Sequence, residues 1–162
     1  MSFEKKFAEQ RKRFERKLKR ARGIAGNSAV RHFRDSFRNE GFTDETLEKW
    51  KQVQRKIPGT LAYELATGAA RSRGILRGPG RGRLSKSVKV LESSEYKVVV
   101  GVEGVPYAPY HNYGVTWSQR SLFGRQLKKV LRVEIPKRQF IGNSKKLENA
   151  ITERLGEAWA QS

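Results

Sequence analysis

The chain has 162 residues, with 35 Lys or Arg against 16 Asp or Glu, a formal net charge of +19 at pH 7 and no cysteine. Its length suits one domain with a core of ordinary size, and its charge indicates a polyanionic or acidic partner. The lack of cysteine excludes disulfides, thiolate nucleophiles and zinc–thiolate sites, and it is typical of proteins in a reducing cytoplasm.

The N-terminal segment reads MSFEKKFAEQRKRF and lacks the apolar run of a signal peptide. No later segment has the roughly 18 consecutive apolar residues that a membrane span needs. We therefore expect a soluble protein without a membrane partner.

A narrow apolar stripe at nearly helical spacing covers residues 3–33 and predicts a long N-terminal helix. Residues 1–38 carry thirteen Lys or Arg against four acids, so the rest of this helix is basic. Gly23 and Gly26 each cost a helix about 1 kcal/mol relative to alanine, and they predict a kink or break. We expect residues 1–28 to form a basic helical extension whose surface meets solvent, nucleic acid or an acidic partner.

Two shorter helices are expected next. Thr43 is a suitable N-cap with acidic residues after it, and the apolar spacing that follows predicts a helix ending before Pro58. Apolar residues within 61–74 predict a second helical stretch, which Thr67 and Gly68 weaken.

Strand patterns then replace the helical ones. Residues 84–91 alternate apolar and polar side chains and residues 96–102 are rich in β-branched side chains, which together predict an antiparallel hairpin. Residues 103–114 have the Gly and Pro content of a loop, and residues 128–135 alternate again as a third strand. Because three strands are the least that a stable sheet needs, we expect an antiparallel sheet of three or more strands.

A C-terminal helix completes the predicted fold. Asn143 or Ser144 can cap it, and residues 147–159 supply its apolar face. The order of helices, strands and a final helix predicts an α+β fold with a long N-terminal helix, short helices, the antiparallel sheet and the C-terminal helix.

Residues 75–88 read ILRGPGRGRLSKSV, a glycine-rich basic stretch. It does not match a P-loop, because it precedes a strand, lacks Gly-Lys-Ser/Thr and contains Pro79, which has no N–H. An Arg-Gly-Arg hook for the DNA minor groove fits it better. We expect a mobile basic loop over residues 71–86 that contacts DNA phosphates, contacts an acidic protein surface or remains in solvent. The six candidate contact residues are Arg71, Arg73, Arg77, Arg81, Arg83 and Lys86.

His32 and His111 are the two histidines of the chain and its only near-neutral bases. His111 lies in a tyrosine-rich loop, where a structural hydrogen-bonding role is more common than catalysis. No His, Asp or Glu set has metal-ligand spacing, and the carboxylates are scattered along the chain. We expect no enzyme, no catalytic residue, no metal and no cofactor.

The second half of the chain carries four sequence motifs in a fixed order. They are ILRGPGRGRLSKSV, a strand that ends in Val-Gly, YAPYHNYG and IPKRQFIG, with FRNEGF and a tryptophan upstream. Together they resemble the bacteriophage virion-morphogenesis or tail-completion proteins, a family that helps to join the tail to the head. The family positions in this chain are Trp50, Tyr107, Ala108, His111, Gly114, Pro136, Arg138, Phe140 and Gly142.

We expect these positions to be mainly architectural. Pro136 ends strand pairing, and Arg138 binds backbone carbonyls or a neighbour's carboxylate. Phe140 anchors the final helix and Gly142 turns the chain. His111 pins its loop.

This chain departs from the family pattern at two places. Asn112 and Tyr113 stand where the family has Gly or Gln beside its histidine. Residues 115–132 are longer and more basic than the resemblance implies, so we describe them as a basic insertion.

The resemblance implies that residues 29–162 form a tail-completion-like domain and that the protein assembles into a homo-oligomeric ring, a hexamer. The implied partners are tail tube or terminator proteins and head connector proteins. Genomic DNA passes through such a ring, which gives the basic loop non-specific DNA contact in the lumen. The implied location is the virion tail or neck, and the host cytoplasm during assembly. The charge alone favours an alternative function, a basic RNA- or DNA-binding module.

Overall fold

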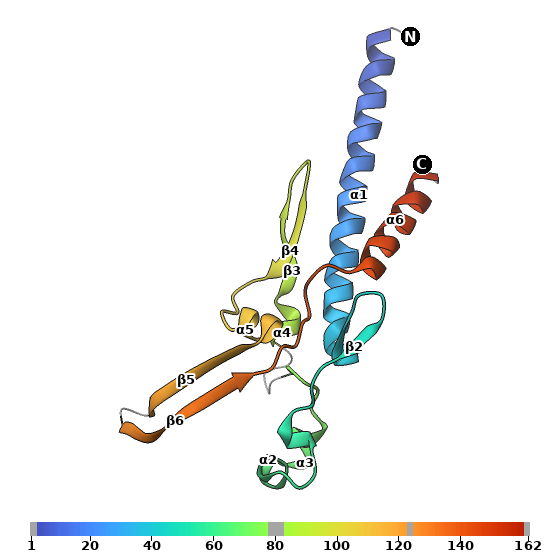
Figure 1. Ribbon diagram of the computed structural model, residues 1–162. Helices are drawn as coiled ribbons and strands as arrows, with labels where there is room; N and C mark the ends of the chain where they lie inside the picture. Colours follow the sequence, from blue (N-terminus) through green and yellow to red (C-terminus); the bar gives the residue numbers. More distant parts are fainter. Residues whose placement is uncertain (1–2, 78–82, 123–124, 161–162) are drawn as a thin grey trace.

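The computed structural model describes residues 3–77, 83–122 and 125–160, and for residues 83, 119–131 and 133 it describes the backbone only. Two long helices lie side by side, α1 at Phe3–Asn39 and α6 at Lys145–Ala160. Figure 1 shows short helices and hairpins gathered around the C-terminal end of α1, while its first turns extend beyond the end of α6.

Helix α1 runs without a break through Gly23 and Gly26, so the predicted kink is wrong. A Cβ atom at Gly26 would lie 2.9 Å from Cγ2 of Val90 and 3.3 Å from Cγ1 of Val98. The absence of a side chain at Gly26 therefore lets a hairpin pack closely on the helix, and this packing offsets the glycine's low helix propensity.

The helix predicted after Thr43 is also wrong. That segment forms a small hairpin of β1 (Gly41–Thr43) and β2 (Leu47–Lys49), followed by the 3-10 turn η1 at Gln54–Lys56. Asp44, expected in the first turn of a local helix, instead accepts a hydrogen bond from the Lys145 N–H (2.8 Å) at the start of α6. A tertiary contact thus uses a carboxylate that sequence reasoning placed in the first turn of a local helix after the Thr43 cap.

The helical stretch predicted over residues 61–74 exists as two short helices, α2 (Leu61–Leu65) and α3 (Gly68–Ser72). Thr60 and Thr67 are their N-caps, and each side chain accepts the N–H of the residue three positions later. Ala66 is extended between them, which is why one continuous helix does not form.

The described residues contain three separate two-stranded sheets, so the prediction of one sheet with three or more strands is wrong. Strand β3 (Val88–Ser93) pairs with β4 (Val98–Val102) as the predicted hairpin, preceded by the single turn α4 at Arg83–Lys86. Strand β6 (Arg125–Ile135) contains the predicted third strand, but it pairs antiparallel with β5 (Val115–Leu122) from the basic insertion.

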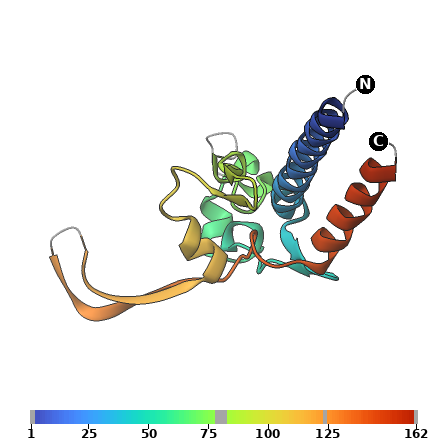
Figure 2. The same cartoon turned by 90° about the horizontal axis from the view of Figure 1, so that it is seen from above.

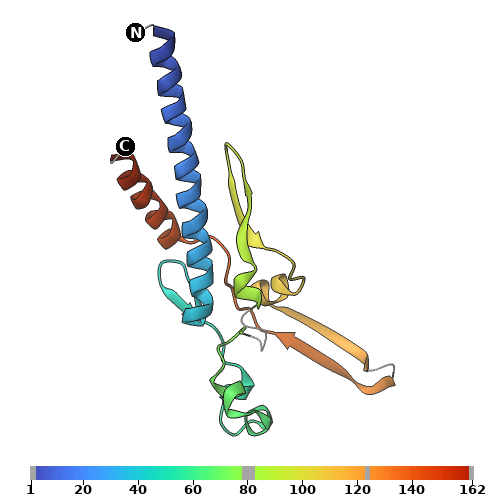
Figure 3. The same ribbon diagram turned by 180° about the vertical axis from the view of Figure 1, so that it is seen from behind.

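The separation of the two hairpins has a local cause. Helix α5 (Ala108–Tyr113) occupies the stretch that was predicted as a loop between the strands. After it, Gly114 adopts a positive φ of 74°, and the chain leaves in a new direction. Figures 1 and 3 show β5 and β6 projecting from the body as a two-stranded arm, while β3 and β4 lie beside α1. We call residues 115–135 the arm.

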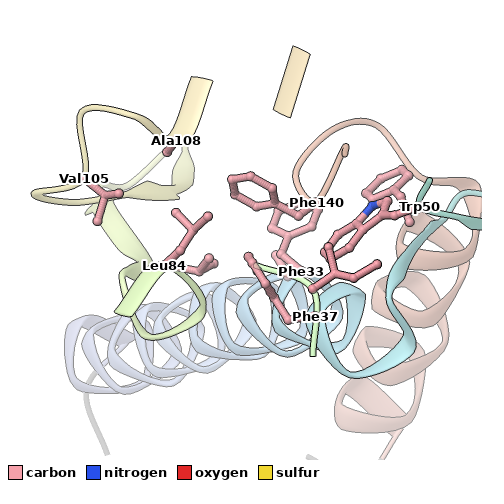
Figure 4. Packing of buried hydrophobic residues seen from close by; sticks show 11 residues of the cluster. Phe33, Phe37, Trp50, Leu84, Val105, Ala108 and Phe140 are labelled. Carbon is pink, nitrogen blue, oxygen red and sulfur yellow. The ribbon is translucent and has the colours of Figure 1, made fainter. Parts of the chain in front are cut away.

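The core sits where the last turns of α1 meet segments from the whole chain. Figure 4 shows Phe33 and Phe37 of α1 gathered with Trp50, Leu84 and Phe140. Phe37 and Phe140 are the largest fully buried side chains, each 1% exposed.

The C-terminal helix is present as predicted, and of the two proposed caps it is Ser144 that caps it. The Ser144 hydroxyl oxygen accepts the Leu147 N–H (3.1 Å) and its O–H donates to the Thr43 carbonyl (2.9 Å). Arg154 donates to the Ser28 hydroxyl (2.9 Å), which ties α6 to α1. Figure 2, seen from above, places α6 on the far side of the body from the arm.

Candidate functional site

The family positions meet at one junction, where α5 packs against residues 136–142. Asn112 joins the two segments, since its Oδ1 accepts the N–H groups of Phe140 (2.9 Å) and Ile141 (3.0 Å) while Nδ2 donates to the Ile141 carbonyl (3.1 Å). Asn112 is buried and replaces the residue type that the family pattern led us to expect. We refer to this packed region, with Trp50 and Phe37, as the junction.

Aromatic rings complete the junction. Phe37 lies 5.0 Å from Phe140 and 5.7 Å, edge to face, from Trp50, measured between ring centroids. The Trp50 indole N–H donates to the Gln139 carbonyl at 2.7 Å. Trp50 and Phe140 therefore hold the segment between the arm and α6 against α1, as expected for architectural residues. We call this segment, residues 136–144, the strap.

The glycine and proline positions of the motifs control the path of the chain. A Cβ atom at Gly114 would lie 2.8 Å from the Lys137 backbone nitrogen, so this turn requires glycine in both φ and space. Pro136 follows the end of β6 at Ile135. At Gly142 a Cβ atom would collide with the side-chain amide of Gln139. Ala108, the first residue of α5, is buried.

His111 and Arg138 are bonded through their backbones, since the Arg138 N–H donates to the His111 carbonyl at 2.7 Å. Arg138 is only 7% exposed. Its guanidinium donates from Nη2 to the Lys51 carbonyl at 3.4 Å. Tyr107 meets the His111 ring edge-on at 5.9 Å. Among the described residues, the buried side-chain atoms without a hydrogen-bond partner are His111 Nδ1 and Arg138 Nε.

Burial lowers the pKa of His111, and the nearby Arg138 charge lowers it further. Burial likewise lowers the pKa of Arg138, with a further contribution from Arg55. Both shifts have the physical sign expected of cationic groups crowded together away from water.

These groups line a cavity of about 380 Å³, a size typical of small-ligand sites. We call it the arginine cavity. Its lining has four arginines, Arg55, Arg73, Arg77 and Arg138, and one histidine, His111; the other lining residues are Val53, Ile75, Leu76, Leu84 and Tyr107. No Asp or Glu is among the lining residues. Sequence reasoning grouped Arg73 and Arg77 in the basic stretch but missed the cavity, because Arg55, His111 and Arg138 come from distant segments and no spacing links them to it.

Of the six residues proposed as DNA or partner contacts, the four whose side chains the structure describes do not share one surface. Arg71 is used locally, as it donates to the Tyr63 carbonyl (3.0 Å) and its guanidinium lies 4.2 Å from the Tyr63 ring centre. Arg73 and Arg77 line the arginine cavity, whereas Lys86 is exposed at the end of α4. Arg81 lies outside the described residues, and so does the side chain of Arg83.

Two exposed elements supply further surface. In the arm, β5 and β6 pair only with each other among the described residues. Near the free end of α1, Phe3, Phe7 and Phe14 are 82%, 65% and 57% exposed. The arm therefore exposes the backbone groups of its strand edges, and the start of α1 exposes apolar side chains. A folded chain normally covers both kinds of group.

The part of the chain that the structure describes has no group of three or more His, Asp or Glu placed to hold a metal ion. Within those same residues, no helix is both long enough and apolar enough to cross a membrane.

Comparison of the chain with protein-family models, with curated proteins and with solved structures finds no match. The resemblance to tail-completion proteins therefore rests on the motif order and remains a prediction.

Proposed function

We propose that this protein is a non-enzymatic bacteriophage structural protein that completes the tail or forms part of the head–tail neck. It acts by assembling into a ring of identical subunits and by adaptor contacts to neighbouring tail and connector proteins. The single observation that carries the proposal is the arm, which extends from the folded body with β5 and β6 paired only to each other within the described residues.

An isolated two-stranded hairpin is marginally stable in water, and unpaired strand edges favour pairing with another chain. The arm register runs from Val115 opposite Ile135 outward to Leu122 opposite Arg125. A neighbouring subunit that received the arm would pair one of its edges and bury its sides. Repetition of this head-to-tail contact closes a ring when the rotation between subunits permits it.

The free end of α1 offers a second, separate contact. Its exposed phenylalanines lie among basic residues, a combination suited to an amphipathic partner with acidic groups. We propose that this end meets a tail or connector protein, while the arm meets a second copy of the chain.

The first experiment measures the mass of the nuclease-treated protein in high salt by light scattering after gel filtration, followed by negative-stain imaging. The proposal expects closed rings. A variant in which residues 117–133 are replaced by a short Asn-Gly turn should elute as a folded monomer.

The matched control shortens the other hairpin, replacing residues 94–97 at its exposed tip with Asn-Gly. This control should still form rings, because β3 and β4 are held by α1. Rings that persist without the arm, or an intact chain that stays monomeric with its proposed partners present, would contradict arm-mediated assembly.

The net charge of +19 and the thirteen cations of residues 1–38 favour a second candidate, a basic nucleic-acid-binding module. Salt-sensitive binding to DNA does not separate the two functions, since any protein this basic shows it. A monomer that binds RNA or DNA, and loses binding when exposed cations of α1 are replaced, would favour the module.

A further inference from the structure

We propose that the arginine cavity is a phosphate-binding site, and that Arg73, Arg77, Arg138 and His111 are the groups that hold the phosphate. The site lies on the body of the protein and is separate from the arm. Phosphate binding at this site can therefore be tested independently of ring assembly.

The first support is the charge of the lining. Four arginines and a histidine surround one cavity of about 380 Å³ that has no carboxylate in its wall. Grouping like charges in a partly buried space is unfavourable unless an anion enters it. The Glu40 carboxylate accepts hydrogen bonds from Lys56 (2.8 Å) and from the N–H of Ile75 (2.8 Å), a residue of the cavity wall, so Glu40 already has two partners.

The second support is a pair of buried polar atoms without partners, His111 Nδ1 and Arg138 Nε. Buried polar atoms are normally paired, and an unpaired one costs about 1–3 kcal/mol. Both residues line the arginine cavity, so the chain itself leaves polar groups of the cavity wall unpaired.

The third support is that the cavity is held in shape by its own arginines. Arg55 donates from Nε to the Ala70 carbonyl (2.9 Å) and from Nη2 to the carbonyls of Arg73 and Gly74 (3.2 Å each). These bonds fix the backbone that carries Arg73, and they use no side-chain donor of Arg73 or Arg77. Arg55 is thus a positioning residue.

A phosphate fits this lining better than a carboxylate. A carboxylate offers two oxygens and one negative charge, whereas a phosphate group offers three or more oxygens and up to two charges. Guanidinium groups bind phosphate oxygens in pairs, and this cavity presents more donors than one carboxylate can accept.

The test titrates the intact protein with inorganic phosphate at about 0.3 M sodium chloride, which screens exposed charges. Binding is followed by calorimetry and by the ring C–H signals of the two histidines in NMR. We expect saturable binding of one phosphate per chain, with the His111 signal shifted. His32, which does not line the cavity, serves as the internal reference.

The variant Arg73→Gln/Arg77→Gln should weaken phosphate binding by about tenfold or more. Its matched control, Arg20→Gln/Arg31→Gln, removes the same charge from exposed positions on α1 and should change binding less than about twofold. Equal weakening by both variants, no saturation, or a shift at His32 instead of His111 would overturn the site. Equally tight binding of acetate would overturn its preference for phosphate.

Two sources can supply the phosphate group, a free phosphate compound or the backbone of a nucleic acid. A short DNA oligonucleotide that displaces inorganic phosphate from the wild type, and binds the cavity variant more weakly than the control variant, assigns the site to nucleic-acid phosphates. An oligonucleotide that binds without displacing phosphate assigns it to a free phosphate compound. Either result supports a phosphate site.

Discussion

The junction and the arm are neighbours in the chain but differ in how they are stabilised. At the junction, three hydrogen bonds from one asparagine and a cluster of aromatic rings connect α1, α5 and the segment before α6. The arm begins directly beyond it at Gly114, and its strands pair only with each other among the described residues. The difference indicates that the junction stabilises the subunit, while the arm is available to a partner.

The two ends of α1 repeat this contrast within one helix. Its C-terminal part carries the buried Phe33 and Phe37, whereas the phenylalanines near its start are mostly exposed. Helix α1 is continuous, so it connects a buried C-terminal part that packs in the core with an exposed N-terminal part that is available for contact with a partner. Substitutions placed in matched pairs across this boundary test the distinction.

The largest expected effect is at the centre of the junction. Phe140→Ala removes a ring that is 1% exposed, and we expect the free energy of unfolding to fall by about 3–5 kcal/mol. Phe14→Ala, at a residue that is 57% exposed, should change it by less than about 0.5 kcal/mol. Urea unfolding followed by circular dichroism measures both, and similar losses would contradict the contrast between the junction and the exposed start of α1.

The next effect comes from the asparagine that joins α5 to the strap. Asn112→Ala leaves the buried N–H of Phe140 without its acceptor, so we expect a loss of about 1–3 kcal/mol in unfolding free energy. The exposed Asn143→Ala is the control and should be close to neutral. Hydrogen exchange of the Phe140 and Ile141 amides should accelerate in the first variant alone; unchanged exchange would show that Asn112 does not secure the strap.

A smaller effect distinguishes the two glycines of α1. A Cβ atom on Gly23 would have no neighbour within 4 Å. Because alanine favours a helix more than glycine does, Gly23→Ala should stabilise the protein by about 0.5–1 kcal/mol. Gly26→Ala places a methyl group against Val90, and we expect no gain or a net loss. Thermal unfolding of both variants gives the comparison, and equal stabilisation would mean that the β3–β4 hairpin does not press on the helix.

The smallest effect concerns pH. Burial lowers the pKa of His111, aided by Arg138, and burial lowers that of His32 despite opposing contributions from its bond to Thr43 and from Asp35. A histidine with a lowered pKa in the folded state binds protons more readily when unfolded, so stability is full above the ordinary histidine pKa and falls as the pH drops below it.

Urea unfolding at about pH 7.5 and about pH 5.5 checks this direction, and the acid-induced loss should shrink in His111→Gln. Tyr107 meets the His111 ring edge-on, and the arginines line the same cavity as His111. Equal stability at the two pH values would show that neither histidine is held neutral by the fold.

Local patterns in the sequence determined the two long helices, the β3–β4 hairpin, a strand within residues 125–135 and the Ser144 cap, because periodicity and capping act over a few neighbouring residues. The architectural expectation for Trp50 and Phe140 also agrees with the packing. The sequence also determined the cationic character that both candidate functions share.

Only the tertiary structure decided how these elements combine. Asp44 caps a helix that begins 101 residues later, and β6 pairs with the insertion instead of the first hairpin. Four arginines from three separate segments meet around one cavity. Each result depends on a contact between residues far apart in the chain, and no local propensity records which distant partner a side chain or strand edge will find.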